Sequence, residues 1–178
     1  MTWTAPQTWQ TGSANKATAA MFNPQIRDNL NHLYRAYVSK TAQEDRTTTT
    51  LADDAALALP IGVSEVWEWS CALLIFAGTT TPDVKIAWAV PAGATGAWGV
   101  LSNDVTTLTQ IVSDSFSAYG DSNVTSVGMS SGYRAVHMSG TVVNSTTAGV
   151  LRMRWAQNTA SGTTSVYTGS YITGFRLS

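Results

Sequence analysis

The chain has 178 residues, and its ten Lys and Arg against eleven Asp and Glu give a formal net charge of -1. This balance argues against capture of nucleic acid or of an anionic membrane by charge, and we expect neither as a partner. Charged residues make up 12% of the chain and hydrophobic residues 44%. Thr, Ser, Gly, Ala and Asn therefore replace much of the usual charge, which suits exposed β surfaces in one domain with an appendage.

Residues 1–22 contain TWTAPQTWQTGSANKATAAMF, which has no hydrophobic periodicity and carries Trp3 and Trp9 in near-repeats. We predict an extended arm. Because exposed indole area is costly, the two tryptophans should dock in pockets, either on a partner or on the body of the same chain. The segment lacks a basic stretch followed by an apolar run, and no apolar run in the chain is long enough for a bilayer, so we expect neither a signal peptide nor membrane insertion.

Residues 23–40 are predicted to form one amphipathic helix. Asn23 is a good N-cap and Pro24 suits the first helical position. An apolar stripe recurs at spacings of four, three and four: Ile26, Leu30, Leu33 and Tyr37. The spacing fits the a and d positions of two heptads, so the stripe suits a bundle of sister copies. Another protein, or the open end of the chain's own β domain, is the alternative partner.

From residue 46 to residue 178 the pattern changes to strands and turns. In SEVWEWSCALLIF, alternate residues fall on one side: Trp67, Trp69, Cys71, Leu73 and Ile75. In VKIAWAV, Val84, Ile86 and Trp88 share a face in the same way. Since Cys71 is the chain's single cysteine, it has no partner for an internal disulfide, and we interpret it as a small buried hydrophobe.

Further strands follow at residues 134–143 and 149–157, which we predict to be a hairpin around NSTTAG, with Leu151, Met153 and Trp155 inward and Arg152 and Arg154 outward. A last strand lies in SYITGFRL. Many short strands separated by Gly, Pro, Asn and Ser breaks indicate an antiparallel, jelly-roll-like β-sandwich. An immunoglobulin-like sandwich is the alternative, although its pair of cysteines is missing.

Titratable residues show no pattern typical of a catalytic or metal site. His32 and His137 have no Cys, Asp or Glu at ligand spacing. Asp53 and Asp54 precede a predicted strand, where Asp favours turns. We therefore predict no catalytic residue, no metal and no cofactor, and expect that the chain is not an enzyme. The outward Arg152 and Arg154 would suit an acidic partner or a glycan, or form only a solvated strand face.

Two segments resemble a known group of proteins. The Trp-containing arm running into FNPQIRDNLNHLY resembles the start of many small structural proteins of tailed bacteriophages, of the minor tail, fibre or head-decoration type. The ending, GTVVNSTTAGVLRMRWAQNTASGTTSVYTGSYITGFRL, is similar to the last strands of the sandwich domains that these proteins carry. Together the two segments cover under half of the chain.

The resemblance implies a trimeric decoration protein or short spike, attached to a phage capsid or tail through its arm and helix. It would be assembled in the cytoplasm of the bacterial host and end on the virion surface. The predicted anchoring residues are Trp3, Trp9, Ile26, Leu30, Leu33 and Tyr37. The alternative is a tail fibre or tail tip module that binds a receptor or glycan on the host surface. A surface hydrolase is disfavoured, because glycosidases need two carboxylates across a cleft.

Overall fold

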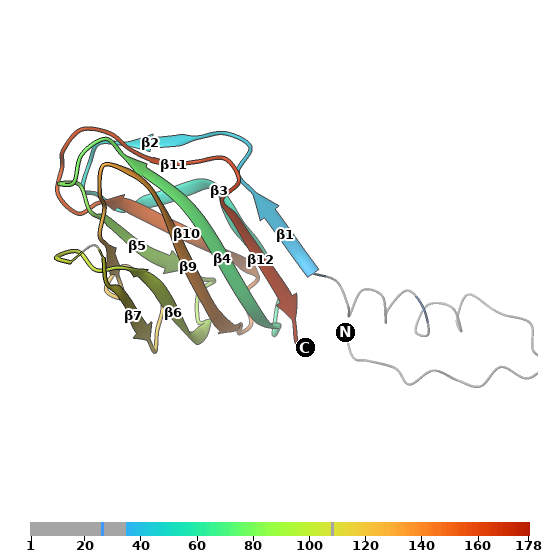
Figure 1. The fold of residues 1–178 in the computed structure, drawn as a ribbon. Coiled ribbons are helices and arrows are strands. Elements are labelled where there is room, and N and C mark those ends of the chain that lie inside the picture. Colours follow the sequence, from blue (N-terminus) through green and yellow to red (C-terminus); the bar gives the residue numbers. More distant parts are fainter. Residues whose placement is uncertain (1–25, 27–34, 108) are drawn as a thin grey trace, which may run out of the picture.

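The computed structural model describes Ile26, residues 35–107 and residues 109–178. The described strands are β1 (Arg35–Ser39), β2 (Glu44–Arg46), β3 (Ala52–Ile61), β4 (Val66–Ala77), β5 (Val84–Ala89), β6 (Thr95–Asn103), β7 (Ile111–Phe116), β8 (Thr125–Val127), β9 (Gly132–Val143), β10 (Gly149–Gln157), β11 (Thr164–Val166) and β12 (Tyr171–Arg176). All of their pairings are antiparallel. The predicted antiparallel β-sandwich is confirmed (Figure 1).

The strands form two sheets. The large sheet has 8 strands, with β1-β12-β4-β9-β6-β7 as its main order; β11 also pairs with β4, and β2 pairs with β11. The small sheet has the order β3-β10-β5-β8. In Figure 1, the long strands β4 and β9 lie in front of β10 and β5. From β3 onward the chain changes sheets at most connections, so sequential strands seldom pair. This alternation is typical of a jelly roll.

The predicted hairpin of β9 and β10 is wrong, because these strands belong to different sheets. Asn144 holds the connection across the gap, since its side-chain amide donates to the carbonyls of Gly62 (2.6 Å) and Thr147 (2.9 Å). The backbone N–H of Asn144 also donates to the carbonyl of Glu65. These bonds fix the connection to the loop between β3 and β4, which crosses between the same two sheets at the same end.

The predicted helix is wrong at its end, because residues 35–39 form strand β1. The rest of that prediction, apart from Ile26, and the predicted arm at residues 1–22 lie outside the described residues. β1 pairs with β12 in the register Tyr37↔Thr173, and the Thr173 hydroxyl donates to the carbonyl of Ala36 at 2.9 Å. Ala36 is buried, whereas Tyr37 is exposed. An alternating pattern therefore underlies RAYVS, and the free edge of β12 supplies the backbone partner that makes it a strand. The β domain therefore already includes residues 35–39, which precede its predicted start at residue 46.

The core lies between the sheets and contains the alternating residues predicted from the sequence. Trp67, Trp69, Cys71, Leu73 and Ile75 of β4 are buried. They face a second buried set from the small sheet: Val84, Ile86, Trp88, Leu151, Met153 and Trp155. The Trp69 and Trp88 rings meet across the sandwich with their centroids 4.4 Å apart. Burial raises the pKa of the Cys71 thiol well above its usual value, which suits the predicted role as a buried hydrophobe.

Candidate interaction surface

The face of the large sheet that points away from the small sheet is called here the outer face. It carries several of the large hydrophobic side chains that remain exposed in the described residues: Tyr37, Leu74, Leu101, Ile111 and Tyr133. The strand register explains their position, because Leu74 alternates with the buried Ile75 and Leu101 alternates with the buried Val100. An apolar face that the other described residues leave exposed is typical of an interaction surface.

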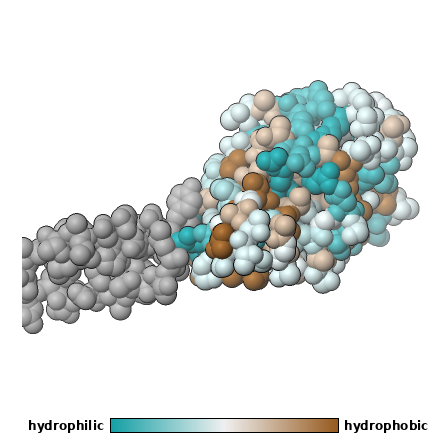
Figure 2. Space-filling model, turned by 180° about the vertical axis from the view of Figure 1, so that it is seen from behind, coloured by the Kyte–Doolittle hydropathy of each residue, from teal (hydrophilic) through white to brown (hydrophobic). Residues whose placement is uncertain are grey.

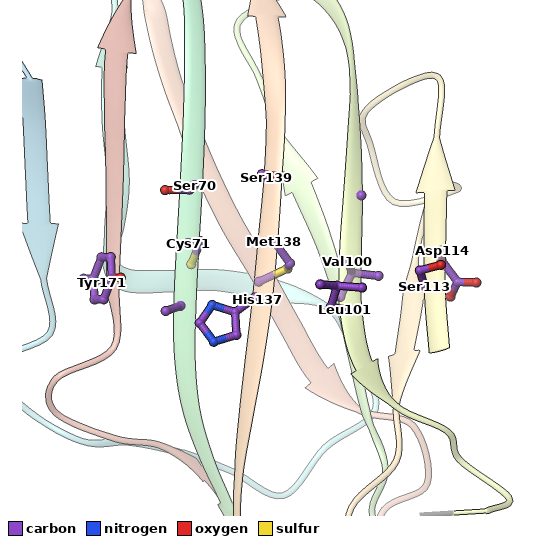
Figure 3. A pocket seen from close by; sticks show the side chains of 12 residues that line it. Ser70, Cys71, Val100, Leu101, Ser113, Asp114, His137, Met138, Ser139 and Tyr171 are labelled. Atoms are coloured by element: carbon purple, nitrogen blue, oxygen red, sulfur yellow. The ribbon is translucent and has the colours of Figure 1, made fainter. Parts of the chain in front are cut away.

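A shallow hollow of about 350 Å³ lies near the middle of the outer face (Figure 3). Its lining includes one cross-strand row, in which Tyr171 pairs with Ala72, Ala72 with His137, and His137 with Leu101. The hollow exists because Ala72 is small while Tyr171, His137 and Leu101 project around it. The described residues contain no group of three His, Cys, Asp or Glu placed to hold a metal ion.

Aromatic rings flank this hollow on the outer face. At one end Phe76, Tyr133 and Tyr167 form a cluster with centroid separations of 5.0, 6.0 and 5.1 Å. A hydrogen bond with Tyr133 raises the pKa of Tyr167, with smaller contributions from burial and nearby charge. At the β1 edge, the rings of Tyr37 and Tyr171 lie 5.6 Å apart. Such rings offer large, rigid contact area at low conformational cost.

The exposed face of the small sheet is different in character. Arg152 pairs with Asp53 at 3.2 Å, and Arg154 pairs with Asp53 at 3.0 Å and with Asp121. Figure 2, which views the molecule from behind, shows a hydrophilic band across the domain. The outward position predicted for the two arginines is confirmed, but their charges are already matched within the chain. Surface pairs of this kind are water-compatible and contribute little to stability.

A second groove, with a volume of about 810 Å³, lies where the edges of the two sheets meet at β1 and β3. Ala36, Val38, Ile61 and Trp67 supply its apolar lining, and Glu65 and Arg176 form an ion pair at 2.9 Å beside it. Burial raises the pKa of Glu65, but hydrogen bonds from Trp67, Gly62 and Arg176 more than offset it, so the net shift is downward. The chain enters the domain beside this groove, because β1 begins at Arg35.

One cluster of charged side chains is largely buried and was not expected from the sequence. The Lys40 ammonium lies 2.7 Å from Asp54 Oδ2 and 2.9 Å from Glu44 Oε2, and the side chains of Lys40 and Asp54 are 1% and 0% exposed. Glu44 also pairs with Arg46, whose guanidinium lies 4.3 Å from the Trp155 ring centroid. Hence Asp54 is not the turn residue predicted, but a buried carboxylate in β3.

Glu44 is held in its ionised form by this cluster. Burial raises its pKa, but a hydrogen bond from the Ala55 backbone and the hydrogen bonds of Lys40 and Arg46 outweigh that effect and lower the pKa to about 2. The only sequence signals were a Lys and two acids in a polar joint, and such joints are usually solvated. The cluster could not be predicted from the sequence, because the fold brings together the end of β1, β2 and β3, which supply its residues.

The structure tests few of the predicted anchoring residues. Trp3, Trp9, Leu30 and Leu33 lie outside the described residues. Ile26 is described and is 42% exposed. Tyr37 is 61% exposed and lies on the outer face of the large sheet instead of on a helix. Tyr37 therefore lies on the candidate surface, but in a strand, and the anchoring role of the set stays a prediction.

No protein-family model matches the chain, and no curated protein sequence matches it. A comparison with solved structures found a chain from the structure of infectious bursal disease virus, Gx strain, with 10% sequence identity and a TM-score of 0.21. The match covers 80% of this chain and 38% of the viral chain. Among the described residues, no helix is long and apolar enough to cross a membrane.

Proposed function

We propose that the chain is a non-enzymatic structural subunit of a bacteriophage particle, a trimeric decoration protein or short spike on the capsid or tail. Its copies pack through the outer face of the large sheet, and the segment before β1 attaches them to the particle. The virion context rests on the resemblance of the two terminal segments. The packing of copies rests on the outer face, where apolar and aromatic side chains lie exposed in the described part of the chain.

The contrast between the two faces of the sandwich carries this proposal. The small sheet presents charges that are paired with one another, such as Arg154 with Asp53 and Asp121. The outer face presents Leu101, 54% exposed, and Tyr133, 52% exposed, among small side chains. Burying apolar area stabilises association by about 25 cal/mol per Å². A stable interface typically buries about 800 Å² on each partner, which is the scale of a sheet face.

The test is the mass of the purified full-length protein in solution, measured by light scattering across a dilution series. We expect a mass of three chains for the wild type and dissociation for Leu101→Asp, which places a charge in the proposed interface. Val63→Asp is the matched control, because Val63 is 55% exposed and lies in the loop between β3 and β4. A wild type that is monomeric at every concentration would overturn the packing of copies, and an unchanged mass for Leu101→Asp would exclude this face.

Attachment to the particle requires a different readout. The chain should be detected by mass spectrometry in purified phage particles. A variant lacking residues 1–34 should keep a folded β domain and lose incorporation. The deletion stops at residue 34 because β1 and Lys40 belong to the domain. Unfolding of this variant would show that the preceding segment is part of the core, and normal incorporation would place the attachment on the β domain.

The alternative function, binding of a host-surface glycan, is supported by the hollow on the same face. Tyr171 offers a ring for stacking on a sugar, and Ser70 and His137 offer polar groups nearby. Screening the full-length protein against immobilised bacterial glycans tests this alternative. If Tyr171→Ala abolishes glycan binding and Tyr37→Ala keeps it, the hollow binds a glycan and not a sister copy.

A further inference from the structure

We propose that Lys40 and Asp54 join covalently, through an isopeptide bond between the Lys40 side-chain nitrogen and the Asp54 side-chain carbon, with Glu44 moving the proton. The bond is a self-modification of the chain and needs no cofactor. It is independent of the proposed function, because it depends only on the buried cluster formed by the end of β1, β2 and β3.

The reacting groups are already in contact. Lys40 Nζ lies 2.9 Å from Asp54 Oδ1 and 2.7 Å from Asp54 Oδ2, the two oxygens bonded to the carboxyl carbon that it would attack. The two side chains are 1% and 0% exposed. When the fold holds two reacting groups about 3 Å apart in a fixed orientation, they need not find each other by diffusion. Their effective concentration is then very high, which lowers the barrier to reaction.

The surroundings of Asp54 suit a tetrahedral intermediate. Oδ1 accepts backbone N–H bonds from Ala56 at 2.9 Å and from Leu57 at 2.8 Å. Two backbone donors on one oxygen form the arrangement that stabilises the oxyanion of acyl transfer. The other oxygen, Oδ2, accepts from the Trp155 indole at 3.2 Å. Oδ1 is therefore placed to carry the developing negative charge, and Oδ2 is placed to leave.

Glu44 supplies the base. Its Oε2 lies 2.9 Å from Lys40 Nζ, within reach of the proton that must be removed. Backbone and side-chain donors keep it deprotonated, because Ala55 N–H donates to Oε2 at 3.0 Å and Arg46 pairs with Oε1. The arrangement places a nucleophile, an electrophile with two oxyanion donors and a base within one buried cluster.

The reaction balances without an oxidant or a second substrate. Lys40 begins as an ammonium and Asp54 as a carboxylate. One Nζ proton passes to Asp54 Oδ2, which lies 2.7 Å away, and the freed lone pair attacks Cγ of the neutral carboxyl group, which places the negative charge on Oδ1. Glu44 takes a second proton from the now positively charged Nζ and passes it to the Oδ2 hydroxyl, which leaves as water when the Cγ–Oδ2 bond breaks and the Oδ1 carbonyl re-forms. The products are one amide and one water, and Glu44 is restored.

The first experiment is the intact mass of the purified full-length protein, measured under denaturing conditions. We expect a mass lower than that of the sequence by one water molecule. Trypsin then locates the change, since Lys40 and Arg46 are cleavage sites in the sequence. The unmodified chain releases residues 41–46 as a free peptide. The modified chain keeps residues 36–46 attached to residues 47–85, and fragmentation shows two amino termini in that product.

Matched variants show whether the loss of one water molecule comes from the Lys40–Asp54 bond or from another reaction in the chain. Lys40→Arg keeps a cation but lacks the amine nucleophile, and Glu44→Gln keeps the shape but removes the base, so both should show the full sequence mass. Lys85→Arg is the control and should keep the loss of water. If trypsin releases residues 41–46 from the wild type in full yield, Lys40 and Asp54 form only an ion pair and the proposal is overturned. This result needs only the wild-type protein, so it decides the question even if a variant fails to fold. A linked Glu44→Gln chain would remove Glu44 from the mechanism.

Discussion

Replacing Tyr119 by Phe tests whether one hydroxyl joins the two long central strands of the large sheet to the segment after β7. The Trp69 indole donates to the Tyr119 hydroxyl at 2.9 Å, and that hydroxyl donates to the carbonyl of Thr141 at 2.8 Å. Trp69 is only 1% exposed. Tyr119→Phe therefore removes two hydrogen bonds and leaves a buried indole N–H without a partner.

The expected loss follows from these contacts. A net hydrogen bond contributes about 1 kcal/mol, and an orphaned buried donor costs about 1–3 kcal/mol. Since the two effects overlap, we expect the free energy of unfolding to fall by about 2–3 kcal/mol for Tyr119→Phe. Urea denaturation followed by tryptophan fluorescence measures this as a lower midpoint with an unchanged slope. Tyr37→Phe is the control, because Tyr37 is 61% exposed.

The pH dependence gives an independent check. Burial raises the pKa of Tyr119 from 10.0 to about 12, and the hydrogen bond from Trp69 lowers it only in part. The folded state thus holds the phenolic proton more tightly than the unfolded state. The resulting stability is complete below pH 10.0 and is lost as the pH rises towards about 12. Tyr119→Phe should lose less stability over this range. A midpoint for Tyr119→Phe equal to that of the wild type would refute the reasoning.

Three further changes are predicted by contacts in the same domain. Gly140→Ala would place a Cβ 2.5 Å from the Ala97 carbonyl oxygen, so we expect the free energy of unfolding measured with urea to fall by about 1–3 kcal/mol. Gly78→Ala is the control, because its Cβ would meet nothing within 4 Å and the stability should change little. Leu151→Ala, at a position with 0% exposure, should cost about 2–5 kcal/mol by the same assay, whereas equal stability of the two chains would contradict the assigned core. When unfolding by acid is followed by circular dichroism, Glu65→Gln should make the stability depend less steeply on pH in the acid range. The lowered pKa of Glu65 contributes stability above the usual value of 4.5 that is lost as the pH falls below it, and a pH dependence as steep as that of the wild type would oppose this role.

The alternation within individual strands was predictable because it reflects the geometry of a single strand. β4 needs only a period of two to place Trp69 and Ile75 inward, and the turn residues around it mark its ends. The inward set of β10 was predicted for the same reason. The pairing of β10 was not, because the partner of a strand depends on which free edge lies nearby in three dimensions. The short loop after Val143 suggested a hairpin, whereas the bonds of Asn144 direct the chain into the other sheet.

The candidate sites depended even more on tertiary structure. Tyr37 fits an apolar stripe of helical spacing and also an alternating strand, and only pairing with Thr173 of β12 decides between the two. The outer face required the order of the large sheet before Leu101 and Tyr133 were seen to share it. Local pattern cannot supply such information, since the residues of one face come from segments far apart in the chain.

The sequence by itself determined the class of this protein: an antiparallel β-sandwich, near neutral in charge, with its tryptophans largely committed to the strands of the core. Those properties follow from composition and from the two-residue period, which are local. The tertiary structure decided that residues 35–39 belong to the domain and which face of the described domain stays exposed. It also decided that the Lys40 ammonium lies 2.7 Å from the Asp54 carboxylate, with both side chains buried. A buried charge is stable only beside its partner, and that partner is chosen by the fold.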